Sequence, residues 1–177
     1  VHRASLVNAS LHSPELLEML SLNMSGALIE YATRQTIDTV DYALGRPSAS
    51  RGVSFFRDDS HSTFHHFVHR VIDKANVTVA VLLVALVYLD RAKSYLSIAI
   101  EEWAYERTFL GALILADKFC SDITLKNIHW AICSGVFDKR DIGLIEREFL
   151  SVLDYELTVQ ESDLLTHHDA LAPHAHP

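Results

Sequence analysis

The sequence contains little proline, and this shortage narrows the range of folds. Its four prolines are Pro14, Pro47, Pro173 and Pro177, so none lies between Pro47 and Pro173. Because proline breaks helix interiors, a long stretch without it favours helices over turns. The same stretch has only four glycines in more than a hundred residues and a 3.6-residue apolar period, and we therefore predict an all-α fold.

Cysteine is equally scarce. The two cysteines, Cys120 and Cys133, form no CxxC pair, and both fall in apolar, helix-like sequence. This pattern offers no disulfide framework and no thiolate metal motif. We predict free, buried or half-buried thiols, as is usual in a reducing compartment.

Basic residues are too few for a nucleic-acid partner. The chain has 15 Lys and Arg against 23 Asp and Glu, which gives a formal net charge of -8. A protein that binds the phosphate backbone needs a basic face to displace counterions. We therefore expect no nucleic-acid binding.

No apolar run is long enough to cross a membrane. The longest, residues 79–89, has no charge, glycine or proline, but a bilayer requires about 20 apolar residues. A helix that is apolar on every side is instead buried in a protein core. We predict that residues 79–89 form such a core helix and that the protein has no membrane partner.

Helix signals occur along the whole chain. Ser13-Pro14-Glu15 is a typical helix start, Gly45 followed by Pro47 is a stop, and Ser25-Gly26 kinks or splits the peripheral arm helix between them. Asp122 and Asp141 are expected to cap two later helices. The further helices are predicted over 64–75, 79–89, 105–119, 122–136, 141–157 and 160–171.

The sequence shows no catalytic or metal-binding constellation. His61, His65 and His69 are spaced four apart, but no HExxH motif or ligating carboxylate accompanies them. We interpret them as a solvated helix face, and expect no metal and no cofactor. A nucleophile in a catalytic setting and a phosphate-cradling glycine loop are missing as well.

Three charged residues lie in line with apolar stripes: Asp90, Lys118 and Glu146. A buried charge is costly unless it is paired. One reading is that each residue contacts a partner at the rim of an apolar patch. The other is that each borders its helix, with Lys118 complementing the dipole at a helix C-terminus. The spacing alone leaves both readings open.

Three motifs around these charges occur in a fixed order. They are residues 86–91 (Leu-Val-Tyr-Leu-Asp-Arg), 115–119 (Leu-Ala-Asp-Lys-Phe) and 145–153 (Ile-Glu-Arg-Glu-Phe-Leu-Ser-Val-Leu). In order and spacing they resemble the cyclin box. Residues 84–91 and 135–143 are especially similar to the fungal PCL-class cyclins, which pair with the cyclin-dependent kinase of phosphate and nutrient signalling.

The resemblance implies an all-α chain with a single five-helix cyclin box. The box is expected over 53–160, after an N-terminal arm helix and linker over 1–52 and before a short C-terminal helix and tail over 161–177. The second box of cell-cycle cyclins is expected to be absent from this chain or cut off, because few residues follow Leu157.

The resemblance also implies a regulatory subunit and not an enzyme. Such a subunit forms a heterodimer with a cyclin-dependent protein kinase and directs it to protein substrates, in the nucleus or the cytoplasm. It clamps the mobile C helix of the kinase, so that the glutamate of that helix meets the lysine that positions the ATP phosphates.

Two residues carry the implied kinase contact. Lys118 matches the family lysine that hydrogen-bonds main-chain carbonyls at the kinase helix. Glu146 matches the glutamate that pairs with this lysine and receives a kinase backbone donor. Positions that line the apolar groove around them are matched by Leu115, Phe119, Leu150, Tyr155 and Leu157. Core packing is an open alternative for these five, and most of all for Leu157.

Asp90 matches the family aspartate that braces the box internally. The arginine that usually pairs with it belongs to a first-helix motif that falls on residues 60–64, Ser-His-Ser-Thr-Phe, where no arginine stands. Arg70 and His61 are the candidate replacements. The same motif forms the substrate-docking patch of cell-cycle cyclins, and only Phe64 keeps its apolar character here.

Two rival functions remain. A cyclin-fold adaptor binds proteins or transcription factors without activating a kinase. A helical enzyme or metal-binding bundle uses the histidines. Kinase assays separate the first from a kinase regulator, and metal analysis tests the second.

Overall fold

The computed structural model describes residues 8–46 and 59–174, and within these residues every regular element is helical. The predicted all-α fold is therefore confirmed. The elements are η1 (Ala9–Leu11), α1 (Pro14–Leu20), α2 (Gly26–Ala43), α3 (Asp59–Ala75), α4 (Val79–Ala92), α5 (Ala104–Cys120), α6 (Asn127–Ser134), α7 (Lys139–Val152), α8 (Glu161–Leu165), α9 (His168–Leu171) and η2 (Ala172–His174).

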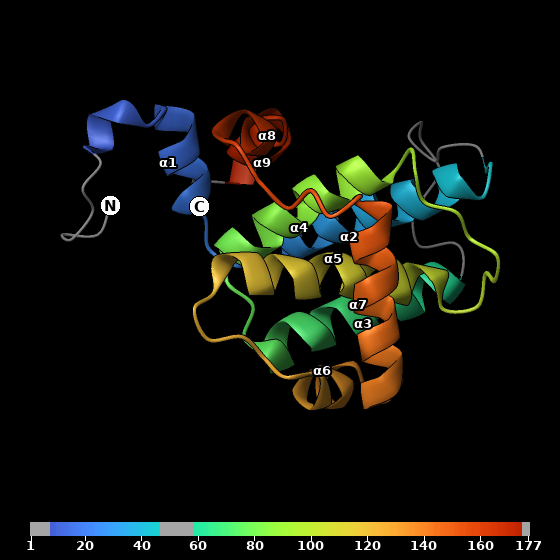
Figure 1. The fold of residues 1–177 in the computed structure, drawn as a ribbon. Coiled ribbons are helices and arrows are strands. Elements are labelled where there is room, and N and C mark those ends of the chain that lie inside the picture. Colours follow the sequence, from blue (N-terminus) through green and yellow to red (C-terminus); the bar gives the residue numbers. More distant parts are fainter. Residues whose placement is uncertain (1–7, 47–58, 175–177) are drawn as a thin grey trace.

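Helix α5 is the centre of the bundle. It packs against α2, α3, α4 and α7, and every residue from 108 to 116 is buried. Gly111 lets α7 approach closely, because a Cβ at this position would lie only 2.6 Å from the Phe149 Cβ. The close crossing of α5 and α7 (Figure 1) therefore depends on the absence of a side chain at Gly111.

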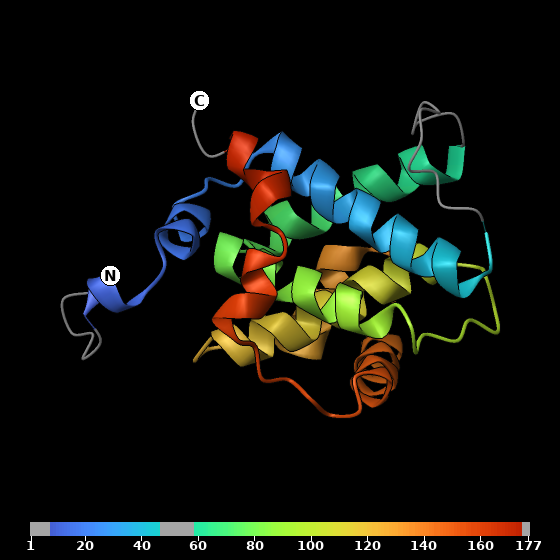
Figure 2. The ribbon, with the colours of Figure 1, turned by 90° about the horizontal axis from the view of Figure 1, so that it is seen from above.

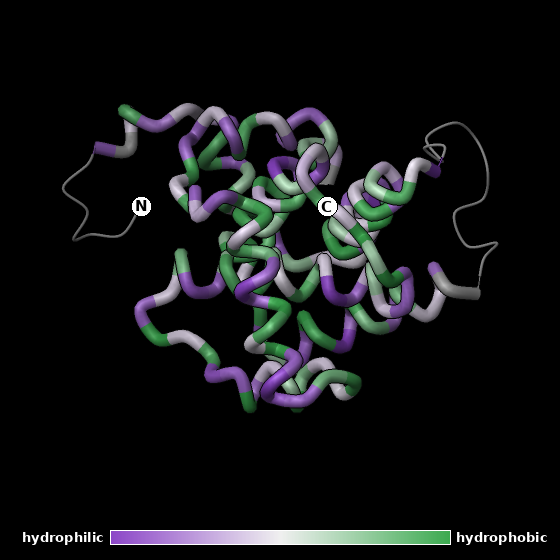
Figure 3. The backbone as a smooth tube through the Cα atoms, turned by 45° about the vertical axis from the view of Figure 1, so that its right-hand side comes forward, coloured by the Kyte–Doolittle hydropathy of each residue, from purple (hydrophilic) through white to green (hydrophobic). Residues whose placement is uncertain are grey.

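Helix α4 is the apolar helix expected over 79–89. Each residue from 81 to 89 is buried, which confirms burial on every side for this part of the run, whereas Val79 is half-buried and Ala80 is exposed. Its start is fixed by Thr78, whose hydroxyl accepts a hydrogen bond from the Val81 amide at 3.4 Å. Most of the other helices are amphipathic, and apolar and hydrophilic stretches alternate along the backbone in Figure 3.

The N-terminal segment differs from the predicted peripheral arm. Ser25 caps α2, with its hydroxyl accepting from the Leu28 amide at 3.3 Å, and so splits the segment into α1 and α2. Only α1 lies at the side, next to α8 and α9. Helix α2 packs against α3, α4 and α5 and runs along the bundle (Figure 2). The expectation of a peripheral helix is thus wrong for α2, because Ile29, Ala32 and Val40 form a buried stripe.

Several helix limits also differ from those predicted. Asp122 caps no helix: α6 begins after Lys126, without a side-chain cap. The cap of α7 is Asp138, with Asp141 completing a capping box three residues later. The C-terminal helix expected over 160–171 is divided into α8 and α9.

Three other expectations concern the whole chain. Both cysteines are free, but only Cys133 is buried and Cys120 is exposed, which corrects the expectation for Cys120. Over the described residues, no helix is both long and apolar enough to span a membrane. The linker expected at the end of segment 1–52 lies largely outside the described residues.

Candidate functional site

Lys118 and Glu146 meet at the edge where α5 crosses α7. Lys118 lies in the last turn of α5, where a positive charge complements the helix dipole. Its Nζ atom is 2.5 Å from Oε1 of Glu146. The two side chains are 37% and 19% exposed, so the pair stands at the rim of the core. A second protein can reach both groups there.

The apolar residues predicted around this pair fall into two sets. Phe119 and Tyr155 are exposed, at 47% and 69%. Leu115 is buried in the core, and Leu150 and Leu157 are half-buried and pack against that core. The exposed ring of Phe119 therefore follows Lys118 directly in the chain, while Tyr155 is exposed in the turn after α7 and the leucines pack against the core.

The turn after α7 explains why Tyr155 projects. Asp154 and Tyr155 both have left-handed backbone conformations, with φ of 49° and 60°. The Tyr155 amide donates to the Leu150 carbonyl at 3.1 Å, which closes the turn. Aspartate tolerates this region, but a tyrosine there is uncommon and strained. Neither residue is a glycine, so nothing in the sequence predicts this turn.

Tyr88 contacts both Phe119 and Leu157. The sequence did not predict it to be a site residue. Its buried ring lies edge-on to Phe119, with centroids 6.5 Å apart. Its hydroxyl donates to the Leu157 carbonyl at 2.8 Å, and burial is the main reason that the pKa of this hydroxyl is raised. The sequence did carry a signal: a tyrosine inside an apolar run needs a partner for its hydroxyl.

Asp90 is paired, but with a residue that the sequence did not suggest. Its Oδ2 lies 3.3 Å from Nε2 of His167, which is almost fully buried. The approach is close enough for an ion pair but is not aligned as a hydrogen bond. On its other side, the His167 Nδ1 is 2.9 Å from the Tyr31 hydroxyl. Burial raises the pKa of Asp90 and lowers that of His167.

Neither candidate replacement for the missing arginine contacts Asp90. Arg70 donates to the Ser134 carbonyl at 2.5 Å, and the His61 ring is 3.4 Å from the Tyr105 hydroxyl. Asp90 therefore ties α4 to the C-terminal segment through His167 and not to α3.

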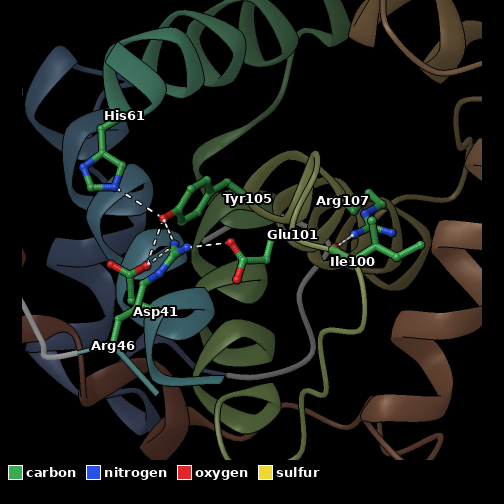
Figure 4. A network of polar contacts seen from close by, with 7 residues as sticks. All are labelled: Asp41, Arg46, His61, Ile100, Glu101, Tyr105 and Arg107. Carbon is green, nitrogen blue, oxygen red and sulfur yellow. Dashed lines mark hydrogen bonds and ion pairs between the residues drawn. The ribbon is translucent and has the colours of Figure 1, made fainter. Parts of the chain in front are cut away.

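The Tyr105 hydroxyl is the hub of a second polar network (Figure 4). It donates to Asp41 at 2.9 Å and accepts from Arg46 at 3.2 Å. Arg46 also contacts Glu101 at 2.7 Å. Burial, together with Asp41, raises the pKa of Tyr105 to about 12. The network joins α2 to the beginning of α5 and holds His61 there.

The docking patch and the histidine face are both expected on α3. Phe64 is completely buried against the rings of Tyr105 and Phe109, so its side chain offers no docking surface. The rings of His65 and His69 lie 4.6 Å apart. In the part of the chain that the structure describes, no group of three or more His, Cys, Asp or Glu is arranged to hold a metal ion.

Comparison with known proteins gives one family match. The model of the cyclin N-terminal domain matches residues 36–158, a span that begins within α2 and includes α3 to α7. The chain is 36% identical to PHO85 cyclin-2 and to PHO85 cyclin-1 of Saccharomyces cerevisiae, each over 103 residues. It is 32% identical to PHO85 cyclin-9 of the same yeast, over 102 residues.

Each of these three alignments covers 56% of this chain and between 33% and 37% of the relative. The chain thus matches about a third of the length of these curated relatives.

Proposed function

The chain belongs to the cyclin family, and from this we propose that it is the regulatory subunit of a cyclin-dependent protein kinase. The relatives are named as cyclins of PHO85, so a kinase of the PHO85 type is the proposed partner. In this proposal the chain does no chemistry of its own. It positions the kinase C helix and so completes the site that holds the ATP phosphates.

The observation that carries the proposal is the Lys118–Glu146 pair, which stays partly exposed and has the exposed Phe119 directly after Lys118 in the chain. An ammonium group has three N–H donors and the contact with Glu146 uses one of them, so Lys118 keeps donors for main-chain carbonyls of a helix. Glu146 keeps an acceptor oxygen for a backbone N–H. Exposed aromatic rings next to a charge pair are typical anchors of a protein interface.

The expected interface is of standard size or larger, about 1,600 Å² in total, because the subunit has to hold a mobile helix. Asp90 has a different proposed role, as an internal brace. Its contact with His167 supports this role, since it holds the C-terminal segment next to the end of α4.

Two measurements test the proposal. Purified chain is added to a PHO85-type kinase, and we expect capture of the kinase together with stimulation of its phosphoryl transfer to a protein substrate. Changing both Lys118 and Glu146 to Ala is expected to abolish capture and stimulation. Capture without stimulation would favour the adaptor function instead. Undiminished capture by the folded double variant would reject the assigned surface.

A further inference from the structure

A groove lies on the side of α7 that faces away from Lys118. It consists of two hollows of about 450 and 350 Å³, and their linings share Ile100, Arg107, Ile145 and Glu148. One wall is the connection between α4 and α5, and the other is α7. We call this feature the α5–α7 groove. None of its lining residues comes from α3, where the resemblance places the family docking patch.

The groove has an apolar floor and an exposed apolar rim. Ile145 and Phe149 form the floor and are buried. On the rim, Ile100, Trp103 and Leu144 are exposed, and Ile100 is 63% exposed. Large apolar side chains gathered at one hollow are a recognised mark of a binding surface, whereas single exposed ones are ordinary.

The connection between α4 and α5, which forms one wall of the groove, is held in place but leaves backbone groups available for hydrogen bonds to a partner. Arg107 holds it, because its guanidinium donates to the carbonyls of Ile100 and Trp103; the first of these contacts is visible in Figure 4. Among the described residues, no hydrogen bond uses the backbone of residues 97–99. An extended peptide can pair with such a stretch by adding a strand-like segment beside it.

The charged residues around the groove indicate which charge its partner should carry. Three carboxylates line it, those of Glu102, Asp141 and Glu148. The single cation, Arg107, is directed at carbonyls. Asp141 accepts the α7 cap hydrogen bond, but in the described part of the chain neither Glu102 nor Glu148 takes part in an ion pair. The groove is therefore negative as well as apolar.

We propose that the α5–α7 groove binds an extended segment of a partner protein in which apolar side chains alternate with Lys or Arg. The apolar side chains lie on Ile145 and Phe149, and the basic ones reach Glu102 and Glu148. Glu146 and Glu148 are two residues apart on one helix, which places them about 200° apart around its axis. The groove and the Lys118 surface are thus separate, and both can be occupied at once.

The test is a titration of the isotope-labelled chain with three synthetic peptides, followed by NMR. The probe is Gly-Lys-Ile-Lys-Val-Lys-Gly. One control replaces its lysines by glutamates, and the other replaces Ile and Val by serines. We expect the probe alone to give saturable shifts at the amides of residues 97–100 and at the Trp103 indole. Equal binding of the acidic peptide, or shifts confined to other surfaces, would overturn the proposal.

Variants make the test specific. The double change Glu102→Gln and Glu148→Gln removes two exposed charges and is expected to weaken binding of the probe peptide roughly fivefold or more. This binding should also depend less on salt concentration than binding to the wild type. Ile128→Ser, an exposed apolar change on α6 outside the groove, is the matched control and should leave binding unchanged.

The same double glutamine variant is then tested for capture of the kinase, which we expect to be unchanged. Loss of both functions in a folded variant would mean that the groove belongs to the kinase surface, and this would contradict a separate site. Failure of kinase capture by the wild-type chain, with peptide binding intact, would reject the proposed function and leave the groove assignment standing.

Discussion

Two polar pairs stand at the ends of core helices, and they are arranged in opposite ways. In the Lys118–Glu146 pair, both side chains remain partly open to solvent, and the exposed Phe119 directly follows Lys118 in the chain. In the Asp90–His167 pair, the histidine side chain is only 3% exposed and is also bound by Tyr31. In the second pair the chain encloses the histidine, although the Asp90 side chain is 44% exposed. We call the first pair, whose two members both reach solvent, the open pair, and the second, whose histidine is enclosed, the closed pair.

The difference lies in where the second member of each pair comes from. Glu146 is on α7, which crosses α5 without covering its end. His167 lies between α8 and α9, and these short helices pack over α1 and α4. A charge next to an apolar stripe is therefore not by itself a sign of a partner. The same motif is internal where its counterpart is itself enclosed by further segments of the chain, as His167 is between α8 and α9.

The largest expected effect comes from removing the support that both pairs share. Leu86→Asp places an unpaired carboxylate at a fully buried position of α4 and is expected to destabilise the protein by more than about 4 kcal/mol. Urea unfolding followed by circular dichroism measures it. Ala80→Asp is the matched control, because residue 80 is exposed on the same helix; a large loss of stability there would contradict this account.

Exchanging the two residues of the open pair, Lys118 and Glu146, distinguishes the contribution of this pair to stability from its contribution to kinase binding. Lys118→Glu with Glu146→Lys keeps an ion pair between α5 and α7, so we expect a stability change below about 1 kcal/mol. Kinase binding is expected to weaken by about 2–5 kcal/mol, because donor and acceptor are reversed towards the partner. Calorimetric titration with the kinase measures the binding.

The control for the exchange is the same swap in the exposed pair of Glu30 and Arg34 on α2, which should leave kinase binding as it is. If the Lys118–Glu146 exchange binds normally, the open pair is structural, and the contrast between the two pairs disappears.

The closed pair is expected to give the reverse pattern. His167→Ala removes the buried ring that contacts Asp90 and Tyr31 and should lower the free energy of unfolding by about 1–3 kcal/mol. Tyr31→Phe removes only one hydrogen bond and should cost less. Folded His167→Ala protein should still bind the kinase. A binding defect larger than its stability loss would show that the C-terminal segment belongs to the partner surface.

The sequence predicted the core of this molecule better than its edges. Helices α3 to α7 follow from apolar periodicity, and the burial of α4 follows from a run without charge. Lys118 and Glu146 stood out because they lie in line with apolar stripes, but this spacing left their role open, and only the order of the motifs favoured a partner contact. The contact of Asp90 with His167 joins residues far apart in the chain, and such pairing depends on how α8 and α9 pack.

The helix limits were least predictable for a related reason. Asp122 and Asp141 are both plausible caps by residue type, yet Asp138 takes the role for α7, and α6 begins without one. The left-handed turn at Asp154 and Tyr155 has no glycine to announce it. Local rules give the candidates for each boundary, and tertiary packing decides between them.

The smallest expected effect is chemical, and it reports whether the open surface is covered. Cys120 is exposed as a residue and directly follows Phe119. Its sulfur is still partly shielded from water, and this desolvation, with a further contribution from Asp117, raises its pKa. Since the thiolate is the reactive form, we expect alkylation by iodoacetamide to be slower at pH 8 than for a free cysteine peptide. The rate should rise about tenfold per pH unit up to the raised pKa.

Bound kinase is expected to slow this alkylation several-fold, because Cys120 follows Lys118 and Phe119 at the end of α5. A Cys133→Ser background leaves one reporter thiol, and mass spectrometry gives the rate. His167→Ala in the same background should show the same protection, since the closed pair lies outside the proposed contact. If Cys120 reacts at one rate with and without saturating kinase, the kinase does not cover the end of α5. The open pair would then need another explanation for its exposure.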